Sequence, residues 1–260
     1  MLEASHLTLR HDGLTLLDDL SLTAACGELT LIIGPNGAGK STLLSLLSGL
    51  RMPASGQIRL CGHDPYRLGA RELARLRAVV EQAPGWQPGF SAAELVMMGG
   101  YLPAGRQADW RDAMRLMRCD ALAERRLETL SGGERQRVHL ARALLQLLCS
   151  DATQRLLLLD EPTAALDFGL ADALMAQLRE LAQTHRIGIV AVVHDLNLAG
   201  RHADRILLMK NGCGAAFGTP SEVMRKERLE AIYGVRLAEL ISQDEQLRAF
   251  VPLSGTDERD

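Results

Sequence analysis

The sequence is poor in aromatic residues, and its opposite charges almost cancel. Only 3% of the 260 residues are Phe, Trp or Tyr, which speaks against a surface on which the bases of single-stranded nucleic acid stack. The formal net charge of −3 gives no electrostatic case for binding nucleic acid. No apolar run approaches the roughly 18 residues that a membrane span needs. We therefore expect neither a nucleic-acid partner nor a membrane-spanning segment.

The sequence also lacks paired cysteines and a secretion signal. Its five cysteines form no Cys-x-x-Cys pair and lie far apart, at Cys26, Cys61, Cys119, Cys149 and Cys213. This spacing favours buried free thiols in a reducing compartment over zinc ligands or disulfides. The N-terminus has no basic and apolar leader. These absences predict a protein of the cytosol, or one that a partner holds on the cytosolic face of a membrane.

One glycine-rich stretch fits the phosphate-loop pattern G-x-x-x-x-G-K-[ST]. It reads Gly34-Pro35-Asn36-Gly37-Ala38-Gly39-Lys40-Ser41-Thr42. A predicted buried strand (29–33) precedes it and a predicted helix (41–50) follows it, which is the order that a phosphate cradle requires. We expect Lys40 to reach the β- and γ-phosphates, Ser41 to hold Mg²⁺, and Thr42 to seat the α- or β-phosphate.

A run of four leucines, residues 156–159, ends in Asp160 and Glu161. Such a run is typical of a strand buried on both faces in a parallel sheet, and open α/β sheets bind their ligands at the carboxyl ends of the strands. We expect Asp160 to hold the Mg²⁺ shell and Glu161 to orient or polarise an attacking water. Two acids in a solvated turn are the alternative interpretation.

Two further strands and one helix start complete the candidate site. The strands predicted to end before Gln82 and His194 place these side chains at the same sheet edge as Lys40 and Glu161. The stretch Ser131-Gly132-Gly133 opens a predicted helix and forms a second anion-binding element. Taken alone, this stretch would more often be an ordinary helix cap, and the two carboxylates that follow at 160–161 favour the anion-binding interpretation.

Strands alternate with helices along the chain and predict a mainly parallel α/β core. Residues 2–10 are predicted to be an edge strand. From Ser91 to about Cys149 the pattern becomes helical, and we interpret this stretch as a helical subdomain inserted into the core. The predicted division is a core of residues 1–84 and 150–240, a helical subdomain of approximately 85–149, and a tail of 241–260.

Together these motifs resemble the ATP-binding subunits of ABC transporters over nearly the whole chain. Residues 34–42 match Walker A, Gln82 the Q-loop, residues 130–134 the signature motif, Asp160 and Glu161 the Walker B motif with its catalytic glutamate, Asp167 the D-loop, and His194 the switch histidine. His11 departs from the pattern, because the family usually places an aromatic residue there, often tyrosine, that stacks on adenine. Histidine can also stack, although more weakly, and the resemblance therefore implies that His11 contacts the nucleotide. The resemblance implies a phosphate-loop NTPase core with an antiparallel β subdomain and an inserted helical subdomain.

The family's mechanism follows as an implication of the resemblance. Two such subunits dimerise head to tail, so that each ATP lies between one phosphate loop and the partner chain's Ser131, Gly132, Gly133 and Asp167. Lys40 and Mg²⁺ hold the phosphates, Glu161 positions water, His194 contacts the γ-phosphate, and Gln82 senses the metal. The implied partners are two transmembrane permease subunits and a periplasmic haem-binding protein, with the ATPase on the cytoplasmic face of the inner membrane. A pocket between residues 83 and 105 is expected to dock a permease helix.

Three stretches bear on which transporter this is. Ser131 and Asp160 are 29 positions apart (131 to 160), several more than is usual in the family, with the excess around residues 146–155. Importers of haem and cobalamin show a similar extension. Residues 193–199 and 232–235 also look like those of metal-chelate importers. The greatest overall likeness is to the ATPases of haem (hemin) importers.

Alternatives from the same and from other classes remain. A siderophore–iron or cobalamin importer fits the same motifs. A soluble ABC ATPase of translation would usually carry two nucleotide-binding domains, and one of DNA repair would carry long coiled coils; this chain has neither. The signature motif and His194 argue against a kinase or a GTPase. A GTPase would also need an N-K-x-D-type motif that recognises the base.

Overall fold

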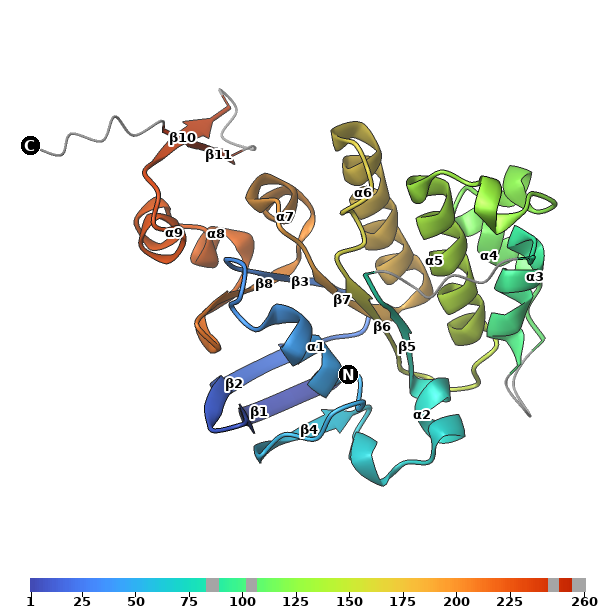
Figure 1. Ribbon diagram of the computed structural model, residues 1–260, viewed down its shortest axis with the longest axis horizontal. Coiled ribbons are helices and arrows are strands. Elements are labelled where there is room, and N and C mark those ends of the chain that lie inside the picture. Colours follow the sequence, from blue (N-terminus) through green and yellow to red (C-terminus); the bar gives the residue numbers. More distant parts are fainter. Residues whose placement is uncertain (83–88, 102–106, 243–247, 254–260) are drawn as a thin grey trace, which may run out of the picture.

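The computed structural model describes residues 1–82, 89–101, 107–242 and 248–253. A six-stranded sheet forms its centre, in the order β5-β6-β7-β3-β8-β9 (Figure 1). The strands are β3 (Leu29–Ile33), β5 (Arg77–Val80), β6 (Arg155–Asp160), β7 (Ile187–Val192), β8 (Arg205–Lys210) and β9 (Cys213–Gly218). All neighbours are parallel except the β8–β9 hairpin. The predicted mainly parallel α/β core is therefore confirmed.

Alternate residues of each central strand face two separate hydrophobic cores. Leu157 and Leu159 of β6 belong to one core, and Leu156 and Leu158 belong to the other. A strand buried on both faces needs apolar residues throughout, which explains the unbroken leucine run. Figure 1 shows helices α6 (Phe168–His185), α7 (Leu196–His202), α8 (Pro220–Val223) and α9 (Lys226–Tyr233) above the sheet, with α1 (Lys40–Leu47) below it.

A smaller antiparallel sheet covers α1 from below, in the order β2-β1-β4 (Figure 1). Its strands are β1 (Leu2–His11), β2 (Leu14–Ala24) and β4 (Ser55–Leu60). The prediction that residues 2–10 form an edge strand is wrong, because Leu2 pairs with Ala24 on one side and with Leu60 on the other. The second partner comes from a strand more than 50 residues along the chain, and the local pattern of β1 carries no trace of it.

Over the described residues of the inserted subdomain, on the right of Figure 1, the structure has three α-helices, in agreement with the predicted helical stretch. They are α3 (Ala92–Met97), α4 (Trp110–Leu116) and α5 (Gly132–Leu148), and short 3₁₀ turns at 98–100, 120–122 and 127–129 connect them. Ser91 caps α3 with a capping box, since its hydroxyl accepts from the Glu94 N–H and Glu94 accepts from the Ser91 N–H. A further 3₁₀ turn (Pro65–Arg67) and α2 (Ala70–Leu76) lead into β5.

The structure shows where the additional residues between the signature motif and Asp160, around 146–155, lie in the fold. They form the last turn of α5 and the connection from its end to β6, and they bind the end of α2 and the start of β5. Gln146 Nε2 donates to the carbonyls of Ala74 and Arg77 at 2.8 and 2.9 Å, and Ser150 Oγ donates to Arg75 O at 2.6 Å.

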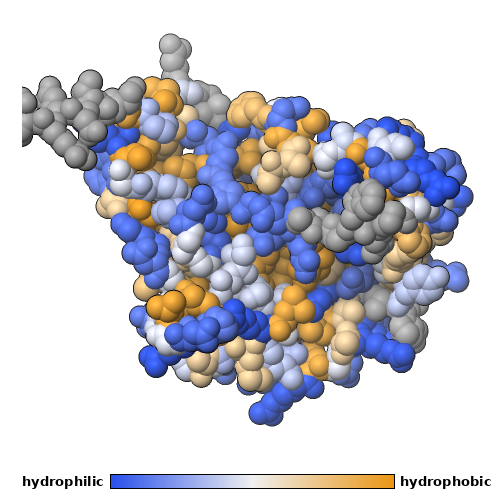
Figure 2. All heavy atoms as spheres, in the orientation of Figure 1, coloured by the Kyte–Doolittle hydropathy of each residue, from blue (hydrophilic) through white to orange (hydrophobic). Residues whose placement is uncertain are grey.

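The chain continues past α9 into a hairpin of β10 (Leu237–Ile241) and β11 (Arg248–Pro252). The predicted boundary at residue 241 falls at the end of β10, inside this hairpin. Figure 2 shows hydrophobic and hydrophilic residues interspersed over the face of the molecule in view. Within the described residues, every helix is too short or too polar to cross a bilayer.

Candidate functional site

The phosphate loop joins β3 to α1 at the carboxyl edge of the central sheet. α1 begins at Lys40, and its cap, Gly39, has φ 95°, a left-handed conformation that favours glycine. Gly34 is required for a different reason. A Cβ on Gly34 would lie 2.3 Å from the carbonyl oxygen of Met209 in β8. The first glycine of the loop thus allows two backbones to approach closely.

Lys40 lies inside the loop that it terminates. It is only 6% exposed, and its Nζ donates to the carbonyls of Gly34 and Pro35 at 2.8 and 3.0 Å. Burial lowers the pKa of Lys40, and the nearby carboxylates of Glu161 and Asp160 act in the opposite direction. Two backbone carbonyls therefore fix an ammonium group at the loop, where it can bind an anion.

Two adjoining cavities lie along this edge. One of about 360 Å³ is lined by Leu16, residues 36–42, Glu161 and His194. Another of about 310 Å³ shares Ser41 with the first and is lined as well by Gln82 and Asp160. The structure thus brings together the predicted loop residues 36–42 with Gln82, Asp160, Glu161 and His194.

Ser41 and Asp160 meet where the two cavities adjoin. Ser41 Oγ donates to Asp160 Oδ1 at 3.1 Å. Burial raises the pKa of Asp160, while the Ser41 hydrogen bond acts to lower it. A hydroxyl and a carboxylate are hard oxygen donors, and Mg²⁺ is usually held by one or two such groups together with phosphate and water. The donor set fits Mg²⁺ bound with a nucleotide phosphate.

Glu161 is held from both sides. Gln82 Nε2 donates to Glu161 Oε2 at 2.6 Å, and His194 Nε2 lies 2.5 Å from Glu161 Oε1. The Glu161 side chain is 15% exposed, and its backbone has φ 49°. A non-glycine residue in this left-handed region is strained, and such strain is concentrated at functional sites. Here the turn directs the carboxylate from the end of β6 into the phosphate cavity.

The second predicted anion-binding element lies outside both cavities. Ser131 caps α5 with a capping box, in which its Oγ accepts from the Glu134 N–H at 3.2 Å and Glu134 accepts from the Ser131 N–H at 2.8 Å. The helix start packs on the segment after β6, because a Cβ on Gly133 would lie 2.6 Å from Leu166 Cδ2. Asp167 caps α6 by accepting from the Leu170 N–H. None of these residues lines its own chain's phosphate cavity.

His11 also lies outside the phosphate cavity. Its side chain is 62% exposed, and its Nε2 is 3.5 Å from the Asp12 carboxylate. Leu16 of β2 lines the cavity instead, and the sequence interpretation did not single it out. Leucine within an ordinary strand carries no signal of such a position. Met209, which packs on Gly34, was missed for the same reason.

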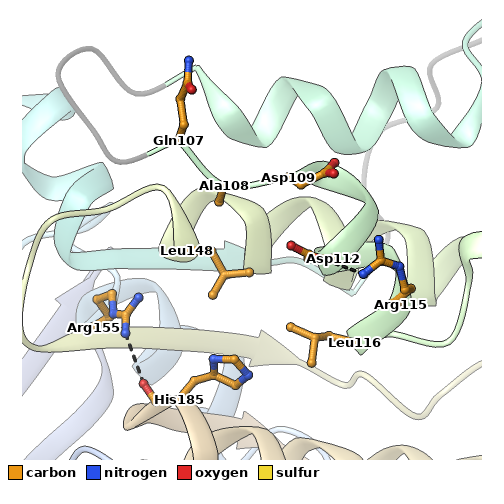
Figure 3. A pocket seen from close by; sticks show the side chains of 9 residues that line it. All are labelled: Gln107, Ala108, Asp109, Asp112, Arg115, Leu116, Leu148, Arg155 and His185. Atoms are coloured by element: carbon orange, nitrogen blue, oxygen red, sulfur yellow. Dashed lines mark hydrogen bonds and ion pairs between the residues drawn. The ribbon is translucent and has the colours of Figure 1, made fainter.

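Figure 3 shows a larger hollow, of about 680 Å³, at the opposite end of β6. It is lined by the start of α4 and the ends of α5 and α6. Its charged groups have partners inside the chain. Asp112 pairs with Arg115, and Arg155 donates to the carbonyls of Leu147 and His185 at 2.9 and 3.1 Å. It contains none of the predicted site residues, so size alone does not identify the site.

Comparison with known proteins supplies an independent line of evidence. Residues 17–164 match the family described as ABC transporter. The chain is 41% identical to the hemin import ATP-binding protein HmuV of Burkholderia pseudomallei, over 97% of this chain and 100% of that protein. It is similar to the structure of a metal-chelate type ABC transporter in an inward-facing conformation, with a TM-score of 0.81, 26% identity and 98% of each chain covered. The dimeric structure of MJ0796, a bacterial ABC transporter cassette, matches with a TM-score of 0.73 and 26% identity, over 85% of this chain and 99% of that one.

Proposed function

This chain belongs to the ABC transporter family and is an ATP hydrolase, and from that premise we propose that it energises an importer of haem in the inner membrane. The observation that most directly supports ATP hydrolysis is the position of the Glu161 carboxylate, which is held between Gln82 and His194 beside the phosphate loop. The haem assignment is supported by the 41% identity to a hemin import ATP-binding protein over nearly the full chain. The relative of metal-chelate type agrees with the broader class.

Each residue of the site has a proposed task in hydrolysis. The loop amides and Lys40 hold the phosphates of ATP, and Thr42 seats the α- or β-phosphate. Ser41, Asp160 and Gln82 hold Mg²⁺, which when bound neutralises the charge that develops on the phosphates. Glu161 accepts a hydrogen bond from the attacking water and orients it. His194 donates toward the γ-phosphate while its contact with Glu161 keeps the carboxylate in place.

A second copy of the chain completes the site in this proposal. The capped helix start at Ser131 presents Gly132 and Gly133 as anion-binding groups, yet these lie outside the chain's own phosphate cavity. A head-to-tail dimer supplies them, and Asp167 with them, to the ATP bound by the partner. The dimeric form of the related cassette MJ0796 supports this arrangement. Stacking of His11 on adenine stays a prediction.

The proposed assembly contains two transmembrane permease subunits and a periplasmic haem-binding protein, with the ATPase on the cytoplasmic face of the membrane. Gln82 would couple the site to the helical subdomain. Of the stretch predicted to dock a permease helix, residues 83–105, the structure describes only residues 89–101, and the remainder lies outside the described residues. Crosslinks from a permease that avoid this stretch entirely would contradict the docking prediction.

The test is ATP turnover of the chain assembled with its own permease in lipid. The binding protein is added after loading with haem, a ferric siderophore or cobalamin in separate samples. Stimulation by the haem-loaded protein alone is the expected result. Stimulation by one of the other ligands would replace haem while keeping the importer. Turnover in solution with no stimulation and no permease complex would favour a soluble ABC ATPase.

A further inference from the structure

The charged side chains around the signature motif, residues 130–134, have no task in the proposed hydrolysis. Two of them are arginines that reach the backbone carbonyls just before the start of α5. Arg125 Nη2 donates to Thr129 O at 2.7 Å, and Arg135 Nη2 donates to Leu130 O at 3.2 Å. Two guanidinium groups thus hold the chain where it enters this helix.

Arg125 also binds the carboxylate that belongs to the capping box of α5. Its Nη1 donates to Glu134 Oε1 at 2.9 Å, while Glu134 Oε2 accepts from the Ser131 N–H at 2.8 Å. Each oxygen of the carboxylate therefore has its own partner. The hydrogen bonds with Ser131 lower the pKa of Glu134, and the Arg125 guanidinium acts in the same direction. The Glu134 side chain is consequently ionised at neutral pH.

A negative charge in the first turn of α5 opposes the binding of an anion at the same helix start. Glu134 lies in that turn, next to Gly132 and Gly133, which are proposed to bind the ATP held by a second copy of the chain. Like charges that lie near one another repel, and the carboxylate competes with phosphate for the positive end of the helix dipole. The Arg125 guanidinium, 2.9 Å from the Glu134 carboxylate, offsets this repulsion.

The backbone of Arg125 is itself fixed within the helical subdomain, which lies on the right of Figure 1. Its N–H donates to Leu122 O, and its carbonyl accepts from the N–H of Ala92 at the start of α3, both at 2.9 Å. Leu127 and Leu130, which follow it, are each only 4% exposed and anchor the segment in the core. A side chain that extends from a fixed backbone has less conformational freedom to lose when it binds its acceptors.

We propose that Arg125 is a positioning residue for the signature motif. It orients the start of α5 through Thr129 and Glu134, and it neutralises the carboxylate beside the anion-binding N–H groups. It acts through these groups rather than by contacting ATP. This inference rests on the proposed function, because the ATP concerned is the one bound by the phosphate loop of a second copy. Loss of Arg125 therefore weakens the ATP-bound dimer and leaves ATP binding by the chain's own loop unchanged.

The experiment measures the ATP-dependent equilibrium between monomer and dimer of the full-length chain by analytical ultracentrifugation. Every sample carries Glu161→Gln, so that hydrolysis does not dissolve the dimer, and the chain with this change alone is the parent. Arg125→Ala should raise the dissociation constant of the ATP-bound dimer about three- to thirtyfold, because each dimer loses two ion pairs together with their hydrogen bonds. The Kd of the monomer for ATP should change less than about twofold. An unchanged dimer dissociation constant would overturn the inference.

Arg115→Ala is the matched control, since Arg115 lies in the same subdomain and makes an exposed ion pair with Asp112. The exposed fraction of its side chain is 59%, against 44% for Arg125. This variant should dimerise as the parent does. If the two variants weaken the dimer equally, the loss is not specific to the signature motif, and the positioning role is overturned.

Adding Glu134→Gln to Arg125→Ala distinguishes the proposed role from a general loss of structure. Glutamine can still accept from the Ser131 N–H and complete the capping box, but it carries no charge. The double variant should therefore dimerise more tightly than Arg125→Ala alone. The defect of Arg125→Ala relative to the parent should also shrink as salt is raised, because salt screens the carboxylate. Dimerisation of the double variant that is no tighter than that of Arg125→Ala would overturn the proposed role.

The parent chain distinguishes failure of this inference from failure of the proposed function. A parent that binds ATP and never dimerises would overturn the shared site of the proposed function, and this inference with it. ATP-dependent dimerisation of the parent, with Arg125→Ala dimerising equally well, would overturn the inference alone.

Discussion

Replacing Glu161 by Gln should separate ATP binding from ATP hydrolysis. The side chain keeps its size, and its two contacts, with Gln82 Nε2 at 2.6 Å and His194 Nε2 at 2.5 Å, can both be remade. An amide presents one acceptor and one donor, so Gln82 can rotate its own amide or His194 can change tautomer to match. We therefore expect the free energy of unfolding to change by less than about 1 kcal/mol.

The catalytic loss should be far larger than the loss of stability. An amide cannot accept the proton of the attacking water, and general-base catalysis contributes about 10²- to 10⁴-fold. Turnover should fall by that factor, which corresponds to ~3–5 kcal/mol of barrier. ATP affinity should be kept or increased, because a negative charge beside the phosphates has been removed.

The assay for Glu161→Gln combines ATP turnover, equilibrium ATP binding and the molecular mass of the chain with and without ATP. The variant should bind ATP and accumulate as a dimer, because the hydrolysis that would release the partner is blocked. Glu180→Gln, an exposed position on α6, serves as the control and should behave as wild type. A Glu161→Gln chain that stays monomeric and turns over ATP at the full rate would refute the role assigned to Glu161.

Three further predictions concern the loop and the core. Lys40→Ala should lose most nucleotide binding. An unchanged ATP affinity in titration would contradict the assignment of residues 34–42 as a phosphate-binding loop. Gly34→Ala should destabilise the chain by about 2–5 kcal/mol, since its Cβ would lie 2.3 Å from Met209 O in a conformation that alone costs about 1–2 kcal/mol. Gly13→Ala is the control, because Gly13 has φ +78° and a Cβ there would have no atom within 4 Å. In urea unfolding it should lose only the free energy that the backbone conformation costs. Equal losses of stability in the two variants would contradict the close approach of Gly34 and Met209. Burial lowers the pKa of His139 to about 4, and the unfolded chain protonates it near pH 6.5. Stability should therefore be complete above pH 6.5 and fall by up to about 3 kcal/mol toward pH 4, whereas His139→Gln should flatten this profile; identical profiles would exclude His139 as the cause.

The phosphate loop and the two acids at the end of β6 could be predicted because their signals are local. The glycine pattern, the preceding strand and the following helix all lie within residues 29–50. Asp160 and Glu161 stand directly after four consecutive leucines, and such an apolar run by itself indicates a strand that is buried on both faces. Parallel strands then bring their carboxyl ends to one edge of the sheet, so His194 and Gln82 join the site without any knowledge of distant pairing.

The rest depends on contacts between residues far apart in the chain. Nothing near residues 2–10 indicates that a strand at 55–60 will pair along their free side. The position of α9 beside β8 also depends on a contact between distant residues, because Lys210 Nζ donates to Ala231 O. The exposed position of His11 is likewise decided by the small sheet as a whole. Such placements follow from tertiary packing, which sequence periodicity does not encode.

The central claim is that each ATP site is shared between two chains, and mixing two inactive variants tests it most directly. One chain carries Lys40→Ala. The other carries Ser131→Asp, which keeps the cap of α5 while placing a negative charge against the partner's phosphate. Each variant alone should be inactive, because each homodimer has two damaged sites.

Mixed dimers should recover turnover. They contain one intact site, formed by the wild-type loop of one chain and the wild-type Ser131 of the other. With random pairing, about a quarter of the wild-type sites are restored. Recovery near that level would support a shared site. No recovery on mixing, with wild-type turnover intact and mixed dimers demonstrated, would contradict the account.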